Sequence, residues 1–183
     1  MNLNMEKLVD KMNIKLKKLK LSDANRRYLS WLQDYEITRY TDQCYIKQSL
    51  KVIRNYIQNK NKSKNDYLFG IFVKVKKKYF HIGNIRLSNV NHFHKTGMIS
   101  LFIGDKNFIG KKIGTKAISK VCNFAKKIGL YKVFAGVYKS NVQSQRSFLK
   151  NGFIKEGIQK KQVLFEGRRE DLIWYGRWLK ILK

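Results

Sequence analysis

The most constraining feature of this sequence is an apolar strand that leads through a glycine-containing loop into an amphipathic helix. The strand is expected at residues 97–104 and the helix at 113–128, where apolar residues recur at helical spacing and Gly129 follows as a terminator. At the start of such a helix, unpaired N–H groups and the positive helix end attract anions. Gly110 and Gly114 let the backbone approach a diphosphate closely. The segment therefore predicts a phosphate-binding loop in a fold that mixes strands and helices.

Two known phosphate-binding patterns do not fit this loop. It lacks the G-K-[ST] ending of a Walker loop, and its G-x-x-x-G spacing differs from the G-x-G-x-x-G of dinucleotide-binding folds. Lys111 and Lys112 add positive charge at the helix start. A turn before a tightly packed helix start is the alternative interpretation of two such glycines.

The other elements are expected on both sides of this segment. Those before it are a strand from Ile14, a helix capped by Ser22 that carries apolar positions up to Tyr35, a helix capped by Ser49 that ends in the polar run 59–65, and strands at 67–75 and 79–91. Those after it are a strand at 132–138, a helix at 142–150 and two terminal strands, the first formed by 153–159 and 162–165 and the second by 171–178. No internal repeat or long linker interrupts this order, so we expect one domain over residues 1–183.

The charge of the chain is extreme. It has 40 Lys and Arg residues against 12 Asp and Glu, a formal net charge of +28, while the 43% of hydrophobic residues excludes a basic disordered tail. Such a positive field attracts anions such as nucleotide phosphates and repels polyamines and basic peptides. The lysines come in scattered pairs, which is typical of solvated faces. A nucleic-acid groove is therefore not the first expectation, although the charge keeps nucleic acid open as a partner.

The two cysteines, Cys44 and Cys122, form no disulfide or metal-binding pattern. Cys122 falls on the apolar stripe of the helix at 113–128, so packing is its expected role. The longest apolar run, 67–73, is far shorter than the roughly 20 residues of a membrane span, and the N-terminus shows no signal-peptide pattern. We therefore expect a cytoplasmic protein with no metal and no membrane contact.

Two separated blocks in the sequence resemble a known family. ISLFIGDKNFIGKKIGTKAI, followed by VYKSNVQSQRSFLKNGFIKEG, is similar to the core of the GNAT superfamily of acyl-CoA N-acyltransferases, over roughly Ser22 to the C-terminus. The resemblance implies an α+β fold with α/β/α layers and a mixed, mostly antiparallel central sheet. It also implies an enzyme that uses acetyl-CoA as acetyl donor, with a homodimer as a possible assembly.

The resemblance also implies which residues bind the coenzyme. In the family, the strand before the loop holds the pantetheine arm, the loop and helix start hold the pyrophosphate, and the next helix contacts the coenzyme again. The implied coenzyme-binding residues are Leu101, Phe102, Ile103, Ile109, Gly110, Lys111, Lys112, Ile113, Gly114, Thr115, Asn141, Ser144 and Phe148.

The chain departs from the family pattern at three places. Ile109 and Lys112 occupy loop positions that are usually Gln or Arg and Gly, and Lys112 is suited to bind phosphate by charge instead. The strand segment Gly97-Met-Ile-Ser100 contains no carboxylate where many members place a Glu base. Phe148 stands where many members place a Tyr that protonates the leaving thiolate, so that proton must come from another group or from water.

Several residues are candidates for the missing catalytic groups. His94, and after it His92, is a candidate base, because a loop histidine titrates near neutrality; an ordinary exposed histidine is the alternative. Tyr138 and Ser147 are candidate acids or water-holding groups, with packing as the alternative.

The resemblance implies that the helical segment 22–62 covers the acceptor site. Asp34, Tyr35, Glu36, Arg39 and His92 are the candidate acceptor contacts. Arg39 is suited to bidentate binding of a phosphate, and a salt bridge with Glu36 is the alternative.

The segment from Gly83 to Gly97 is most similar to nucleotide-linked 4-amino-sugar N-acetyltransferases of the pseudaminic acid pathway. The tail 152–157, with Asp171, is also similar to acetyltransferases of protein N-termini. We therefore expect a nucleotide-linked amino sugar as acceptor. A protein N-terminus, or a non-catalytic module that binds nucleic acid, is the alternative.

Overall fold

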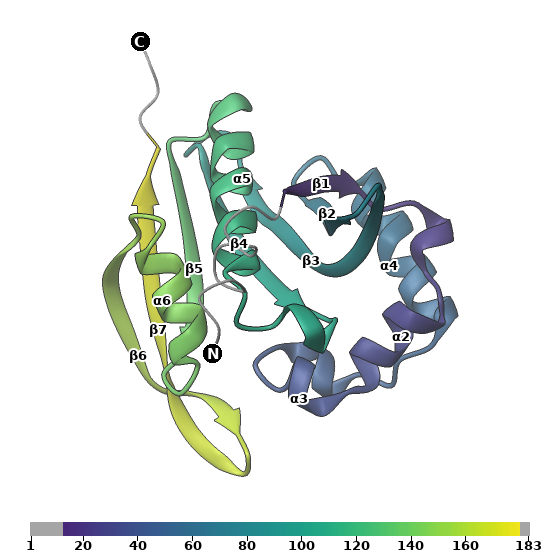
Figure 1. Cartoon of the computed structure of the whole chain (residues 1–183). Coiled ribbons are helices and arrows are strands. Elements are labelled where there is room, and N and C mark those ends of the chain that lie inside the picture. Colours follow the sequence, from purple (N-terminus) through teal and green to yellow (C-terminus); the bar gives the residue numbers. More distant parts are fainter. Residues whose placement is uncertain (1–12, 180–183) are drawn as a thin grey trace.

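The computed structural model describes residues 13–179, and these form a seven-stranded sheet with helices on both faces (Figure 1). The strands are β1 (Ile14–Lys18), β2 (Tyr67–Val75), β3 (Lys78–Asn91), β4 (Thr96–Ile103), β5 (Lys132–Tyr138), β6 (Ile154–Phe165) and β7 (Arg168–Trp178). The helices are α2 (Arg26–Gln33), α3 (Tyr35–Thr38), α4 (Leu50–Lys62), α5 (Ile113–Lys127) and α6 (Val142–Leu149), with short 3-10 turns at Leu21–Asp23, Asp42–Tyr45 and Lys106–Phe108.

The sheet has the strand order β1-β2-β3-β4-β5-β7-β6, and every neighbouring pair is antiparallel except β4 with β5. This topology confirms the expected α+β fold with a mixed, mostly antiparallel sheet. The single domain expected over 1–183 includes residues outside those described.

The parallel pair β4–β5 is short. Thr96–Met98 of β4 pair with Lys132–Phe134 of β5, and beyond these residues the two strands diverge, as Figure 1 shows. Ile99–Ile103 of β4 and Ala135–Tyr138 of β5 are therefore not paired with each other. An opening forms in the middle of the sheet where these segments separate.

Two apolar clusters hold the helices on the two faces. The larger one joins the buried stripe of α5, including Ala117 and Val121, to sheet residues such as Ile85 and Val133. The smaller one joins α2 and α4 to the other face of β2 and β4, and Trp31 is among its buried residues. Amphipathic helices on both sides thus cover a sheet whose inward residues alternate along each strand.

The segment before β2 differs from the expected helices. Ser22 lies in the 3-10 turn, and Asn25 caps α2 through its Oδ1, which accepts a hydrogen bond from the Tyr28 N–H at 3.0 Å. Asp34 then ends α2 and caps α3 by accepting from the Glu36 N–H, so Tyr35 belongs to a separate helix. The helix capped by Ser49 continues to Lys62, beyond the predicted end near Asn59.

The two terminal strands also differ from the prediction. β6 is one strand from Ile154 to Phe165, and the predicted interruption is an irregularity of register around Lys161, whose φ is 51°. The Asp171 carboxylate accepts a hydrogen bond from the Lys161 N–H at 3.0 Å and holds the bulge. β7 begins at Arg168, three residues earlier than predicted. The solvated edge position of this hairpin weakens the apolar alternation by which strands are recognised in sequence.

Candidate active site

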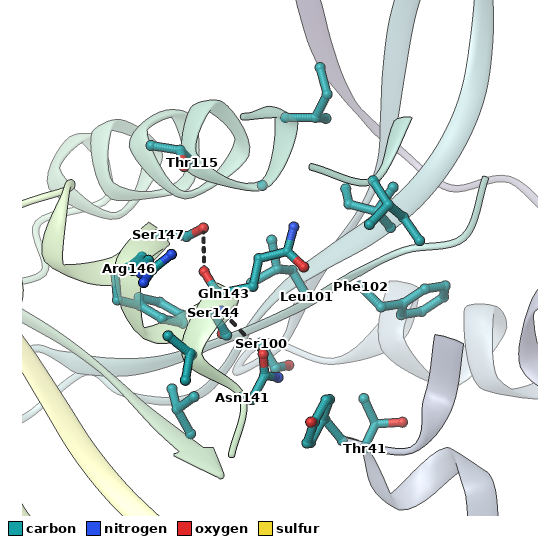
Figure 2. Close-up of a pocket in the computed structure, with 18 of the residues that line it drawn as sticks. Thr41, Ser100, Leu101, Phe102, Thr115, Asn141, Gln143, Ser144, Arg146 and Ser147 are labelled. Carbon is teal, nitrogen blue, oxygen red and sulfur yellow. Dashed lines mark hydrogen bonds between the residues drawn. The ribbon is translucent and has the colours of Figure 1, made fainter. Parts of the chain in front are cut away.

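The diverging strands β4 and β5 open into a cavity of about 940 Å³, a size in the usual range of small-molecule sites. Its walls come from β4 (Ile99–Ile103), β5 (Gly136–Tyr138), the loop before α5, the start of α5, and α6. The remaining wall is the α3 segment, residues 36–41, which comprises most of α3 and the residues that follow it. Figure 2 shows Ser100, Leu101 and Phe102 of β4 and Asn141, Gln143 and Ser144 at the start of α6 among the residues that line this space. The cavity therefore connects the two faces of the sheet.

The loop before α5 forms one end of the cavity. Gly110 has a φ of 76°, and a Cβ built on it would meet no atom within 4 Å, so the backbone there faces open space. Lys112 is the N-cap of α5 at a φ of 54° and provides no side-chain cap. A Cβ on Gly114 would lie 3.4 Å from Leu101 Cδ1, an ordinary van der Waals distance. Gly110 thus serves the loop's conformation and access, whereas no steric contact requires a glycine at position 114.

The start of α6 forms the adjacent wall. Asn141 caps the helix, with its Oδ1 accepting a hydrogen bond from the Ser144 N–H at 3.1 Å (Figure 2). The Ser147 hydroxyl donates to the Gln143 carbonyl at 2.9 Å. Phe148 is buried and packs edge-on against Phe153. The hydroxyl hydrogen of Ser147 is therefore engaged, while its oxygen lone pairs stay available.

The charges differ between the two ends of the cavity. At the end formed by α5 and α6, the charged lining residues are Lys112, Arg146 and Lys150, all of them basic. At the end formed by α3, Glu36, Arg39 and Lys106 line the cavity, and Lys106 pairs with Asp34. An anion such as a diphosphate is therefore favoured at the first end, where the helix start adds its dipole.

Arg39 is held by two carboxylates at the α3 end. Its Nη1 lies 3.5 Å from Glu36 Oε2 and 3.5 Å from Glu166 Oε1. Glu166 belongs to the turn between β6 and β7, so this contact joins α3 to the tip of the terminal hairpin. The salt bridge with Glu36 is the alternative that the sequence left open for Arg39.

A cluster of three aromatic side chains lies at the α3 end of the cavity. Tyr40 stacks on Phe165 with ring centroids 4.8 Å apart, and Tyr138 contacts both rings edge-on. Burial, together with nearby acidic groups such as Asp42, raises the pKa of Tyr138 to about 12. Within residues 13–179, no hydrogen bond to the Tyr138 hydroxyl forms. Tyr138 is therefore a protonated, unpartnered donor in the cavity wall.

The structure gathers most of the expected site residues around this cavity. The expected residues that line it are Leu101, Phe102, Ile103, Ile109, Gly110, Lys112, Ile113, Gly114, Thr115, Asn141, Ser144, Phe148, Tyr138, Ser147 and Arg39. Lys111 is not among them, and its Nζ lies 5.6 Å from the centre of the Phe108 ring. Tyr35 is exposed and does not line the cavity.

His92 and His94 lie elsewhere. They belong to the turn between β3 and β4, and neither lines the cavity, whose nearest β4 residue, Ile99, lies three positions along the strand from Thr96, roughly 10 Å. His92 Nε2 is 3.3 Å from the Lys64 carbonyl oxygen. The structure thus does not bring these histidines to the cavity.

Other lining residues were not anticipated from sequence. Gln143 and Arg146 follow Asn141 on α6, and their position after the cap is a signal that could have identified them. Tyr40 meets Phe165 only because the chain folds, and no local pattern indicates that contact.

Residues 13–179 contain no group of three or more His, Cys, Asp or Glu side chains that could hold a metal ion. No helix among these residues is long and apolar enough to cross a membrane.

A parallel pair that opens into a cavity, beside a glycine loop at a helix start, defines the fold class of acyl-CoA-dependent acyltransferases. The family profile described as "Acetyltransferase (GNAT) domain" matches residues 13–154, most of the chain. The chain therefore belongs to the GNAT acetyltransferase family and is an acyltransferase of the N-acetyltransferase type.

Individual relatives agree with this assignment. The chain is 32% identical over 155 residues to the probable N-acetyltransferase YjcK of Bacillus subtilis (strain 168), covering 84% of this chain and 82% of the relative.

Solved structures show the same fold at low identity. One is the spermidine N-acetyltransferase of Vibrio cholerae in complex with CoA and spermine, at 17% identity and a TM-score of 0.80, covering 92% of this chain and 96% of that one. Another is the microcin C7 self-immunity acetyltransferase MccE in complex with acetyl-CoA and AMP, at 22% identity and a TM-score of 0.77, covering 93% and 94%.

Proposed function

We propose that this N-acetyltransferase moves the acetyl group of acetyl-CoA to the primary amine of a small molecule, a nucleotide-linked amino sugar. The observation that carries the proposal is the cavity between β4 and β5, which has a basic end at α5 and α6 and a separate end at α3. A donor and an acceptor can therefore reach the same strand edge from different directions. The net charge of +28 favours an acceptor that carries phosphate.

The residues at the basic end fit the donor. The open backbone at Gly110 and the α5 start suit a diphosphate, and Lys112 and Arg146 add positive charge. The unpaired edge of β4 at Leu101–Ile103 suits the amide-containing arm that joins the diphosphate to the sulfur. When bound, acetyl-CoA supplies the acetyl group as a thioester.

Acceleration then depends on placing the amine beside the thioester. Well-oriented reactants reach effective molarities of roughly 10⁵ M or more, which reduces the need for a strong base. Backbone N–H groups on the free edge of β4 are the donors that we assign to the charge developing on the thioester oxygen. Water, oriented by the lone pairs of Ser147, carries the proton away from the amine.

Tyr138 supports the departing sulfur by hydrogen bonding. A thiol has an ordinary pKa of about 8.5, far below the value of about 12 for Tyr138. Complete proton transfer from Tyr138 to the thiolate would be uphill by roughly 5 kcal/mol. We therefore assign Tyr138 the role of a hydrogen-bond donor that stabilises the thiolate, while solvent supplies the proton.

The test is acetyl-CoA-dependent thiol release, measured with a panel of amines. The panel contains a UDP-linked 4-amino sugar, the free amino sugar, spermidine and a peptide with a free N-terminus. We expect the fastest release with the UDP-linked sugar. Faster transfer to the peptide or to spermidine would replace the amino-sugar acceptor, and no amine-dependent release with any acceptor would overturn the proposed reaction.

A further inference from the structure

Arg86, on the side of the sheet where α4 lies, has no counter-ion among residues 13–179. Arg86 is a partly buried residue of β3, and its Nη1 donates a hydrogen bond to the Tyr56 hydroxyl of α4 at 3.2 Å. Its Nε is buried without a hydrogen-bond partner. Among residues 13–179, no carboxylate forms an ion pair with it. The neutral Tyr56 hydroxyl is thus the hydrogen-bond partner of the Arg86 guanidinium.

The neighbouring cations are compensated. Lys60 lies 3.1 Å from an Asp66 oxygen, Lys106 pairs with Asp34, and Arg39 contacts two carboxylates. Removing a charge from water without a partner is costly, so a buried guanidinium is normally paired. Arg86 is therefore a partly buried cation to which the residues of 13–179 supply no carboxylate.

Arg86 is placed beside the cavity by the strand register. It lies directly opposite Ser100 across the antiparallel β3–β4 pair, so the two side chains share one face, with Cβ atoms about 4.5–5.5 Å apart. Ser100 is exposed and lines the cavity, as Figure 2 shows. Phe102, two residues along β4 on the same face, lines the cavity as well. Arg86 does not itself line the cavity, and its long side chain starts one strand away from a ligand that lies over Ser100.

We propose that Arg86 is a specificity-determining residue that binds an anionic group of the acceptor, a phosphate or a carboxylate, in the part of the cavity over Ser100. The inference deepens the proposed function, on which it rests, because it states what the acceptor must carry besides its amine. A guanidinium is suited to this role, because its planar fork matches the oxygens of phosphate and carboxylate. Nη2, which has no hydrogen-bond partner among the described residues, supplies the N–H donors.

The first experiment compares R86Q, R86K and wild type on matched acceptors. R54Q is the control, because Arg54 is an exposed residue of α4 and its loss changes the net charge by the same amount. The acceptor pairs are a UDP-linked 4-amino sugar with the free sugar, and an amino acid with its amide. In the pair whose anionic group Arg86 binds, we expect R86Q to raise the KM of the anionic acceptor about 10- to 100-fold. The KM of the acceptor that lacks this group should stay at the wild-type value. R86K should recover part of the loss, and R54Q should behave as wild type.

A second experiment does not depend on turnover. CoA-saturated protein at 150 mM salt is titrated with UDP, inorganic phosphate and acetate in a calorimeter. Wild type and R54Q should bind at least one of these anions, and R86Q should bind it at least tenfold more weakly. This result, together with no acetylation of any amine, would preserve the anion site and reject the proposed function. Equal anion binding by wild type and R86Q, or no binding by wild type, would overturn the inference.

Thermal unfolding separates this role from a structural one. If Arg86 served only to hold Tyr56, R86Q would lower the unfolding temperature. Because the change removes a partly buried charge that has no ion pair among the described residues, we expect R86Q to unfold at the wild-type temperature or above it. A lower unfolding temperature, together with equal losses for charged and uncharged acceptors, would assign Arg86 to structure and reject the proposal.

Discussion

Substitution of Gly110 by Ala tests the loop as the donor site, and Gly129 provides a matched control. Both glycines have left-handed backbone, with φ of 76° and 81°, and a Cβ on either one would meet no atom within 4 Å. The backbone penalty of an L-residue in this region, about 1–2 kcal/mol, is therefore the same for G110A and G129A. Both variants should lose this amount of stability in urea unfolding.

Only Gly110 faces the cavity, since Gly129 lies at the far end of α5. A methyl group on residue 110 holds a diphosphate away from the loop and weakens at least one charge-assisted hydrogen bond, worth about 1.5–3 kcal/mol. Calorimetric titration with acetyl-CoA should therefore give a Kd about 10- to 100-fold higher for G110A and a wild-type Kd for G129A. Equal Kd values for the two variants would refute the assignment of this loop to the diphosphate.

Three further predictions concern other parts of the structure. Y138F should reduce kcat about tenfold at an unchanged unfolding temperature, measured by thiol release, because the variant removes only an unpartnered hydroxyl; a wild-type kcat would contradict its role at the sulfur. Burial lowers the pKa of His81, so the stability that neutral His81 contributes is present above its unfolded pKa of about 6.5 and is lost as pH falls below that value. Urea midpoints measured from pH 7.5 to 5 should therefore fall less for H81Q than for the H92Q control. G104A should destabilise the fold by about 2–4 kcal/mol in urea unfolding, because its Cβ would overlap the Trp31 ring; a loss under 1 kcal/mol would show that Trp31 moves freely.

The parts of the fold that the sequence predicted well are those with strong local signals. β2 was predicted at its observed bounds, and α5 was predicted within one residue because its apolar stripe is complete and Gly129 ends it. The helical segment before β2 was predicted too simply, because Asp34 ends one helix and caps the next within one turn. Side-chain capping competes with helix continuation, and periodicity alone does not reveal which wins.

The site was predictable where it follows a motif and unpredictable where it depends on long-range contacts. The loop at Gly110 and the cap at Asn141 were both anticipated, and both line the cavity. His94 lies two residues before β4, yet it does not line the cavity, whose β4 lining begins at Ile99. The contact of Arg39 with Glu166 joins segments that are distant in sequence. Proximity along the chain is thus a poor guide to position across an extended strand.

The tip of the β6–β7 hairpin touches residues 39–45, which follow α3. The contacts are Arg39 with Glu166, Tyr40 with Phe165 and Tyr45 with the Leu164 carbonyl. The gap in the sheet is thus bounded at one end by the paired residues of β4 and β5 and at the other by these contacts. Arg39 and Tyr40 line the cavity, so a substitution at the hairpin tip would alter the cavity wall from a segment more than 120 residues away in sequence.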